Sequence, residues 1–266
     1  MRGSTYIKKF AIGGIAMKKH SKLYGSIGII VATEEEKGAF LNMFDEPDYI
    51  HGRVPGYEIF TWLKVGNCRI HLLCSGYGEI AAAAATQYLI GAYAIDRIIN
   101  YGAVGGLHED NFMQRVGIVK KVVHYGFDLS TIGYPIGKYP GQEDLFISST
   151  EDALPREGLI DLPEFVCASA DKFLDPGIPK RKIREKFSAD ICDMESAGVV
   201  ITCNRNHIPC SLVKAISSGA DESWEVFLRN YTDAAKACVE VIASFVFWRS
   251  RKRPFCLQKI MKFGII

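Results

Sequence analysis

Residues 27–36 read IGIIVATEEE, and this stretch decides the fold class. Its first part is an uninterrupted run of β-branched and small apolar residues, which is typical of a strand covered on both faces. The three glutamates that follow favour a helix start, because acidic side chains stabilise the N-terminal end of a helix. The segment therefore predicts a strand over residues 27–33 and a helix over about residues 34–44.

The same succession of strand, loop and helix repeats along the chain. Further strands are expected at residues 57–65, 68–75, 97–101, 117–124, 164–168 and 208–215, with a hairpin turn at 66–67. Helices are expected at 80–93, 197–203 and 230–248, whereas 126–144 is rich in glycine and proline and predicts a long loop. The predicted fold class is α/β: a single-domain three-layer sandwich in which a mixed, mostly parallel sheet is flanked by helices.

Charge is distributed unevenly along the 266 residues. The net charge is +2, but six of the 32 Lys and Arg residues lie in 1–25 and six in 249–266, and neither segment contains an acid. The residues between them carry 20 basic against 30 acidic side chains. Phosphate binding depends on clustered cations, so no nucleic-acid partner is expected. We predict a basic N-terminal extension (1–25), one domain (26–248) and a basic C-terminal tail (249–266).

The eight cysteines form no C-x-x-C pair, and most lie in apolar runs, which indicates reduced thiols and a cytoplasmic location. Cys203, His207 and Cys210 are residue types that bind metals, but they span the end of a predicted helix and the start of a strand, and no fourth ligand is evident, so no metal is expected. The apolar run 10–17 is too short to cross a membrane, and no membrane partner is expected.

Several polar or glycine-rich segments follow directly after the predicted strands. In sheets of this kind, ligands bind beyond the carboxyl ends of the strands. The segments that gather there are 33–36, 75–79, 102–106, 169–174, 193–196 and 217–221. We therefore expect a ligand site at this edge of the sheet.

The segment CDMESAG at 192–198 carries the most chemical information. A carboxylate at Glu195 can accept hydrogen bonds from two vicinal hydroxyls of a sugar, and the thioether of Met194 offers it an apolar surface. The alternative is a plain helix start in which Asp193 and Glu195 complement the helix dipole.

Other segments allow a similar pair of interpretations. Glu36 either favours a helix start or orients a water molecule, and Phe173 with Leu174 either belongs to the core or stacks on a heterocycle. Ser75 and Gly76 open a glycine-rich turn, where the backbone can approach a ligand closely or simply connect strand to helix.

Taken in order, the motifs resemble one family. TEEE at 33–36, SGYG at 75–78, NYGAVGG at 100–106, the loop at 132–141, SADKFL at 169–174, DME at 193–195 and AIS at 215–217 resemble the 5′-methylthioadenosine/S-adenosylhomocysteine nucleosidases of the purine nucleoside phosphorylase superfamily. The resemblance covers about residues 26–246. It implies a nucleoside phosphorylase-like fold and hydrolysis of the N-glycosidic bond of a 5′-thio-substituted adenosine, with release of adenine and without a cofactor.

The resemblance also implies roles for individual residues. Glu36 would activate water, Glu195 and Met194 would hold the ribose, and Ser75 and Gly76 would lie near the ribose and the water. Phe173 would stack on the adenine, the Leu174 backbone would contact the purine edge, and Ser217 would also belong to the substrate site. Tyr134 and Pro140 lie on a loop that, in the family, completes the 5′ pocket of a neighbouring subunit, so the resemblance implies a homodimer.

One position departs from the family pattern. The family has an aspartate after Ala-Ile-Ser as the acid that protonates the purine, whereas this chain has Ser218. A serine hydroxyl donates a hydrogen bond but is too weak an acid to give up its proton. Either the reaction is slow, or Asp221 replaces the acid directly or through a water molecule. Thr33 also stands where the family often has methionine.

Three functions remain as hypotheses at this point. The first is a nucleoside hydrolase, and the second is a phosphorylase of the same superfamily. A phosphorylase needs cations around residues 75–79, where only Arg69 precedes the loop, and Glu36 would repel phosphate. The third is a nucleoside-binding protein that has lost catalysis, as Ser218 suggests. The 5′ substituent is left open and includes thiomethyl, homocysteinyl, deoxyadenosyl and futalosine-like groups.

Overall fold

The computed structural model describes residues 25–43, 49–65, 68–109, 115–154 and 162–247. Apart from Gly25, the two predicted basic extensions lie outside the described residues. The strands are β1 Ser26–Val31, β2 Tyr49–Val54, β3 Tyr57–Val65, β4 Cys68–Cys74, β5 Arg97–Gly106, β6 Val116–His124, β7 Glu164–Ser169, β8 Ile191–Asp193 and β9 Cys210–Ser218. The helices are α1 Glu34–Met43, α2 Glu79–Tyr93, α3 Ile178–Phe187, α4 Ser196–Asn206 and α5 Trp224–Phe247, with a 3₁₀ turn at Ser130–Ile132.

The strands form one mixed sheet with the order β2-β3-β4-β1-β5-β8-β7-β6-β9. Strand β1 lies parallel to both β4 and β5, and β3 and β4 pair antiparallel as predicted. The predicted turn at 66–67 lies outside the described residues. Strand β9 also pairs with β5, so β5, β9, β6, β7 and β8 pair in a closed circuit. The long parallel pair β5–β9 brings the carboxyl ends of both strands to the same edge of the sheet.

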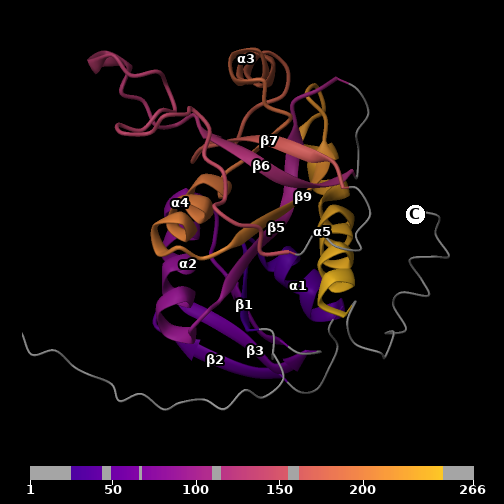
Figure 1. Cartoon of the computed structure of the whole chain (residues 1–266). Coiled ribbons are helices and arrows are strands. Elements are labelled where there is room, and N and C mark those ends of the chain that lie inside the picture. Colours follow the sequence, from indigo (N-terminus) through magenta and orange to yellow (C-terminus); the bar gives the residue numbers. More distant parts are fainter. Residues whose placement is uncertain (1–24, 44–48, 66–67, 110–114, 155–161, 248–266) are drawn as a thin grey trace, which may run out of the picture.

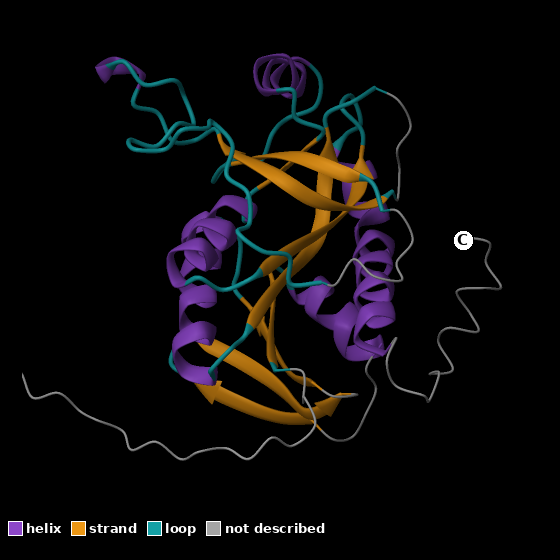
Figure 2. Cartoon of the chain, viewed as in Figure 1, coloured by secondary structure: helices purple, strands orange, loops and turns teal. Residues whose placement is uncertain are grey.

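Helices cover both faces of this sheet. Helices α2 and α4 lie on one side and α1 and α5 on the other, which gives the three layers seen in Figures 1 and 2. Strand β1 shows why: Ile27, Ile29 and Val31 pack into the apolar core under α1 and α5, while Ile30 packs into the core under α2 and α4. The predicted three-layer α/β fold is therefore confirmed.

Several predicted boundaries are wrong in detail. Residues 102–106, expected to close a strand, are the second half of β5, because they continue to pair with β9. Helix α5 begins at Trp224, six residues before the predicted start at 230. Strands β2 and β8 and helix α3 were not predicted. Among the described residues, no helix combines the length and apolar content needed to span a membrane.

Candidate functional site

A cavity of about 390 Å³ lies at the carboxyl ends of the strands. Its walls come from the start of α1, the ends of β5, β8 and β9, the segments after β7 and β4, and the first two turns of α5. Six of the residues expected in a site line it: Glu36, Phe173, Leu174, Met194, Glu195 and Ser218. The two carboxylates predicted to share a pocket therefore lie in the same cavity.

Glu36 is held by four hydrogen bonds at the first turn of α1. Its Oε2 accepts from the backbone N–H of Ala32 (2.9 Å) and Thr33 (3.3 Å), and its Oε1 accepts from the Ala103 N–H (3.1 Å) and the Tyr231 hydroxyl (2.9 Å). The Thr33 hydroxyl accepts from the Glu36 N–H at 3.2 Å, so the two residues form a reciprocal capping box. Glu36 thus caps the helix and also faces the cavity.

The environment of Glu36 raises the pKa of its carboxyl group above the usual value. Only 2% of the residue is exposed. Burial raises the pKa of Glu36, while the Lys214 ammonium and the hydrogen bonds to the carboxylate oppose this rise. A carboxylate in such a position can accept a proton from water better than an exposed one.

Gly102 leaves the space that the Glu36 side chain occupies. A Cβ at position 102 would lie 2.4 Å from Glu36 Oε1, which is too close for any side chain. Gly102 therefore makes room for a side chain of the site, whereas Gly105, three residues on, lines the cavity itself.

Glu195 lies across the cavity at the start of α4. Its Oε1 accepts from the Gly78 N–H at 3.0 Å, and its Oε2 accepts from the Met194 N–H at 3.3 Å. Gly78 has a φ of +97°, a conformation that favours glycine and directs its N–H to the carboxylate. Burial and the nearby Asp193 raise the pKa of Glu195 to about 7, although Lys214 and the Gly78 hydrogen bond oppose the rise.

Asp193 is buried in an ion pair next to the cavity. Its Oδ2 lies 2.9 Å from the ammonium of Lys214, and the two side chains are 3% and 2% exposed. Asp193 also accepts hydrogen bonds from the Ser196 N–H and hydroxyl. Although burial opposes ionisation, Lys214 lowers the pKa of Asp193, and Asp193 raises the pKa of Lys214. Asp193 is therefore ionised and occupied by Lys214 and Ser196. Glu195 accepts one backbone hydrogen bond on each oxygen, so it is the carboxylate that can also accept hydrogen bonds from a ligand.

Aromatic rings form one wall of the cavity. Phe173 is 45% exposed and meets the rings of Trp224 and Phe227 edge-on at 5.1 and 5.6 Å, while these two stack on each other at 5.6 Å. Half-exposed rings that hold one another in place present a face on which a flat heterocycle can stack. Leu174, the next residue after Phe173, is buried and also lines the cavity.

Five of the predicted binding residues do not line the cavity. Ser75 donates to the carbonyls of Val31 and Gly76, and Gly76 has a φ of +82°, so both shape the turn beside the cavity. The hydroxyl of Ser217 donates to the Val104 carbonyl, which makes it a link between β9 and β5. Tyr134 and Pro140 are exposed on the loop that projects from the body between β6 and β7 (Figure 1).

The structure places Ser218 and Asp221 on different cavities. Ser218 lines the cavity described above, whereas Asp221 lines a second one with His108 and Glu109. The chain turns away after β9 because Gly219 donates to Glu222 and Ala220 donates to the His108 carbonyl. Asp221 then lies 3.5 Å from a guanidinium nitrogen of Arg181. Asp221 therefore does not line the cavity that holds Glu36 and Glu195, and its role as a substitute acid stays a prediction.

Several residues that line the cavity or lie beside it were not predicted from the sequence. Trp224, Phe227, Leu228 and Tyr231 have the i, i+3, i+4, i+7 spacing of one helical face, a signal that would have extended α5. Lys214 is the lone cation in the apolar run SLVKAI, which also marks it. Nothing in the sequence marks Lys180 as a site residue, because it is one of five cations on α3.

Chemically, the site combines two carboxylates and a flat apolar wall. One carboxylate is fixed by four donors, and the other is available to hydroxyl groups. Among the described residues, no group of three or more His, Cys, Asp or Glu side chains is placed to hold a metal ion. The arrangement suits a ligand with a sugar at one end and a planar base at the other.

Comparison with known proteins agrees with this geometry. Residues 26–246 match the phosphorylase superfamily. The 5′-methylthioadenosine/S-adenosylhomocysteine nucleosidase of Hydrogenovibrio crunogenus is 30% identical over 217 residues, covering 79% of this chain and 92% of that protein.

Solved structures are similar over most of the chain. A futalosine hydrolase mutant of Helicobacter pylori has a TM-score of 0.77 at 26% identity and covers 84% of this chain and 98% of its own. A point mutant of the Helicobacter pylori nucleosidase, with 5′-methylthioadenosine in its active site, has a TM-score of 0.75 at 25% identity, with 83% and 97% coverage. This chain belongs to the phosphorylase superfamily and, within it, to the 5′-methylthioadenosine/S-adenosylhomocysteine nucleosidases.

Proposed function

We propose that this protein hydrolyses the N-glycosidic bond of 5′-thio-substituted adenosines, such as methylthioadenosine and adenosylhomocysteine, and releases adenine. The observation that carries the proposal is that Glu36 and Glu195 line one cavity whose third side is an aromatic wall. The family to which the chain belongs and its relatives support the same reaction.

In the proposed reaction, each wall of the cavity acts on one part of the substrate. Glu195 accepts hydrogen bonds from the 2′ and 3′ hydroxyls, and Met194 lies against the sugar. Phe173 stacks on the adenine, and the Leu174 backbone contacts its edge. Glu36 orients a water molecule towards C1′ and accepts its proton. Both carboxylates stabilise the positive charge that develops on the ribose as the C–N bond breaks.

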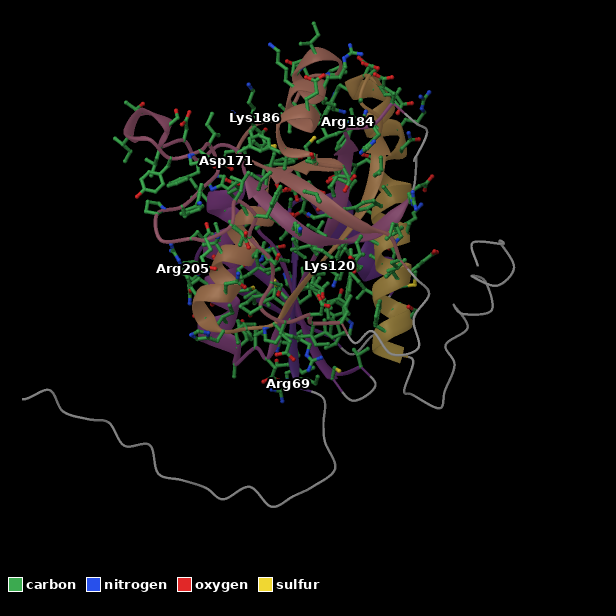
Figure 3. The ribbon with its side chains drawn as sticks, turned by 45° about the horizontal axis from the view of Figure 1, so that its top comes forward. Arg69, Lys120, Asp171, Arg184, Lys186 and Arg205 are labelled. Carbon is green, nitrogen blue, oxygen red and sulfur yellow. The ribbon has the colours of Figure 1, made fainter. Side chains whose placement is uncertain are left out.

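A phosphorylase reaction is the weaker alternative. Arg69 pairs with Ser26 at the amino end of β1, at the opposite end of the sheet from the cavity. Figure 3 shows Arg69 at the pole of the molecule opposite to Arg184 and Lys186 of α3. It cannot serve a phosphate near residues 75–79, and Glu36 would repel a phosphate dianion there.

The direct test is chromatography of the products that purified protein forms from methylthioadenosine, with and without phosphate. We expect adenine and the free methylthioribose in both samples. Adenine that appears only after phosphate is added would show a phosphorylase instead. No product from the wild type, with activity gained by Ser218→Asp, would support the nucleoside-binding protein.

Substrate binding is expected to weaken as the pH falls through about 7. The raised pKa of Glu195 means that its carboxylate is protonated below that pH and then accepts fewer hydrogen bonds from the ribose. Hydrogen bonds to a charged group contribute about 1.5–3 kcal/mol, so KM should rise about 10- to 100-fold. Because Glu36 interacts with Glu195, the apparent pKa belongs to the pair.

The measurement is KM for methylthioadenosine between pH 5 and 9. Glu195→Gln should have a high KM that no longer changes around neutral pH, whereas Glu185→Gln, an exposed residue of α3, should follow the wild type. A variant Glu195→Gln that keeps the wild-type profile would remove Glu195 from sugar binding.

The proposal extends to a homodimer in the cytoplasm. Tyr134 and Pro140 lie on a projecting loop and do not line the cavity of their own chain, which supports a role in a second copy. Tyr77 and Ile80, 72% and 80% exposed, add apolar surface that contact with another chain would cover. Light scattering should give the mass of two chains, and Tyr134→Asp should raise KM for substrates with a large 5′ group. A monomer with full activity would contradict this.

A further inference from the structure

Lys180 is a buried cation that lines the cavity. It lies in the first turn of α3 and is 3% exposed. Arg184 and Lys186 of the same helix are more exposed and lie in the upper part of the molecule in Figure 3. Burying an ammonium without a paired anion is costly, so a folded protein that keeps one there is expected to use it.

The ammonium of Lys180 points to the position that lacks the expected acid. Its Nζ donates to the Gly219 carbonyl at 2.7 Å and lies 3.5 Å from the Ser218 hydroxyl oxygen. Within the described part of the chain, no carboxylate lies within 4.0 Å of Nζ. An ammonium has three N–H groups, so these two contacts leave one for a ligand.

Glycine at position 105 keeps the path from Lys180 to the cavity open. A Cβ there would lie 3.3 Å from Lys180 Nζ and 3.1 Å from the Cys192 sulfur. Gly105, Lys180, Cys192 and Ser218 all line the same cavity as Glu36 and Glu195. The cation is therefore buried from solvent but open to whatever occupies the cavity.

We propose that Lys180, positioned by Ser218 and the Gly219 carbonyl, is the catalytic residue that donates a proton to the leaving purine. This inference rests on the proposed hydrolysis. As the bond between C1′ and N9 breaks, its electron pair stays with the purine, and a proton moves from Lys180 Nζ to N7. The water oxygen bonds to C1′, and its proton moves to Glu36. The neutral amine and the protonated Glu36 then exchange protons with solvent, so no co-reactant is needed.

The surroundings of Lys180 make it a better acid than an exposed lysine. Burial lowers its pKa, while Cys192 on β8 and Asp221 and Glu222 after β9 limit the fall. Proton donation is most effective when the pKa of the donor lies near the working pH. Ser218 alone cannot perform this step, because a hydroxyl does not release its proton at neutral pH.

The test compares two leaving groups in Lys180→Met. The first substrate is methylthioadenosine, and the second is a 5′-methylthioriboside with p-nitrophenolate, which leaves without being protonated. We expect adenine release to fall about 10²- to 10⁴-fold and nitrophenolate release to be retained. Equal losses on both substrates, or no loss on either, would overturn the role of Lys180. A wild type that cleaves neither substrate would overturn the proposed hydrolysis itself.

Two further variants separate charge from proton transfer. Lys180→Arg keeps the cation but holds its proton, so it should stay slow on methylthioadenosine and active on the nitrophenyl substrate. Lys182→Met, an exposed lysine two residues along α3, should match the wild type on both. In the wild type, kcat for adenine release should fall at alkaline pH, whereas nitrophenolate release should show no such fall. Full adenine release by Lys180→Arg would show that only the charge matters and would reject proton donation.

Discussion

Replacing Glu36 with glutamine is expected to lower the rate of adenine release by about 10²- to 10⁴-fold, or about 3–5 kcal/mol of barrier. Glutamine has nearly the same shape but cannot accept the proton of the attacking water. The hydrogen-bond network adds to the effect. All four partners of the carboxylate are hydrogen-bond donors. The NH₂ group of a glutamine would therefore face other donors, either the N–H groups of Ala32 and Thr33 or that of Ala103.

Stopped assays of adenine release, with substrate above KM, measure this loss in kcat. The matched control is Glu34→Gln, the same change two residues earlier, where the side chain is 72% exposed and pairs with Lys37. Thermal unfolding of both variants shows whether the capping box has failed. A Glu36→Gln protein that is folded and turns over at the wild-type rate would remove Glu36 from the chemistry.

The parts of the fold that could be predicted are those with local periodicity or ordered motifs. The run in β1 indicated a strand buried on both faces, and its side chains do alternate between the two cores. Polar segments after the strands predicted where the cavity lies, because parallel strands bring their carboxyl ends together. Glu36 and Glu195 could be placed in one site on this argument alone.

The parts that could not be predicted depend on long-range contacts. Strand β8 has three residues, too few for a pattern, and it exists because β5 and β7 lie on either side of it. The direction of the chain after Ser218 is set by hydrogen bonds to Glu222 and His108, and this is why Asp221 leaves the cavity. No local feature distinguishes Lys180 from its neighbours on α3.

Lys214→Met is expected to lower the free energy of unfolding by about 3–5 kcal/mol, because it leaves Asp193 buried without its cation. The ion pair is 2.9 Å long, and neither side chain is more than 3% exposed. Lys214 also lowers the pKa of both Glu36 and Glu195. Without it both carboxyls should ionise only at higher pH, so the acid side of the activity profile should move upward as well.

Urea unfolding measures the first effect, and Lys236→Met provides the control. Lys236 also pairs with an aspartate, Asp233 at 3.1 Å, but both are more than half exposed, so its loss should change stability by less than about 1 kcal/mol. The double variant Asp193→Asn/Lys214→Met removes both charges and should be more stable than Lys214→Met alone. The double variant could instead be destabilised by the sum of the two single changes. In that case Lys214 stabilises the protein through packing, and neutralising the buried charge of Asp193 is not the reason for a lysine at this position.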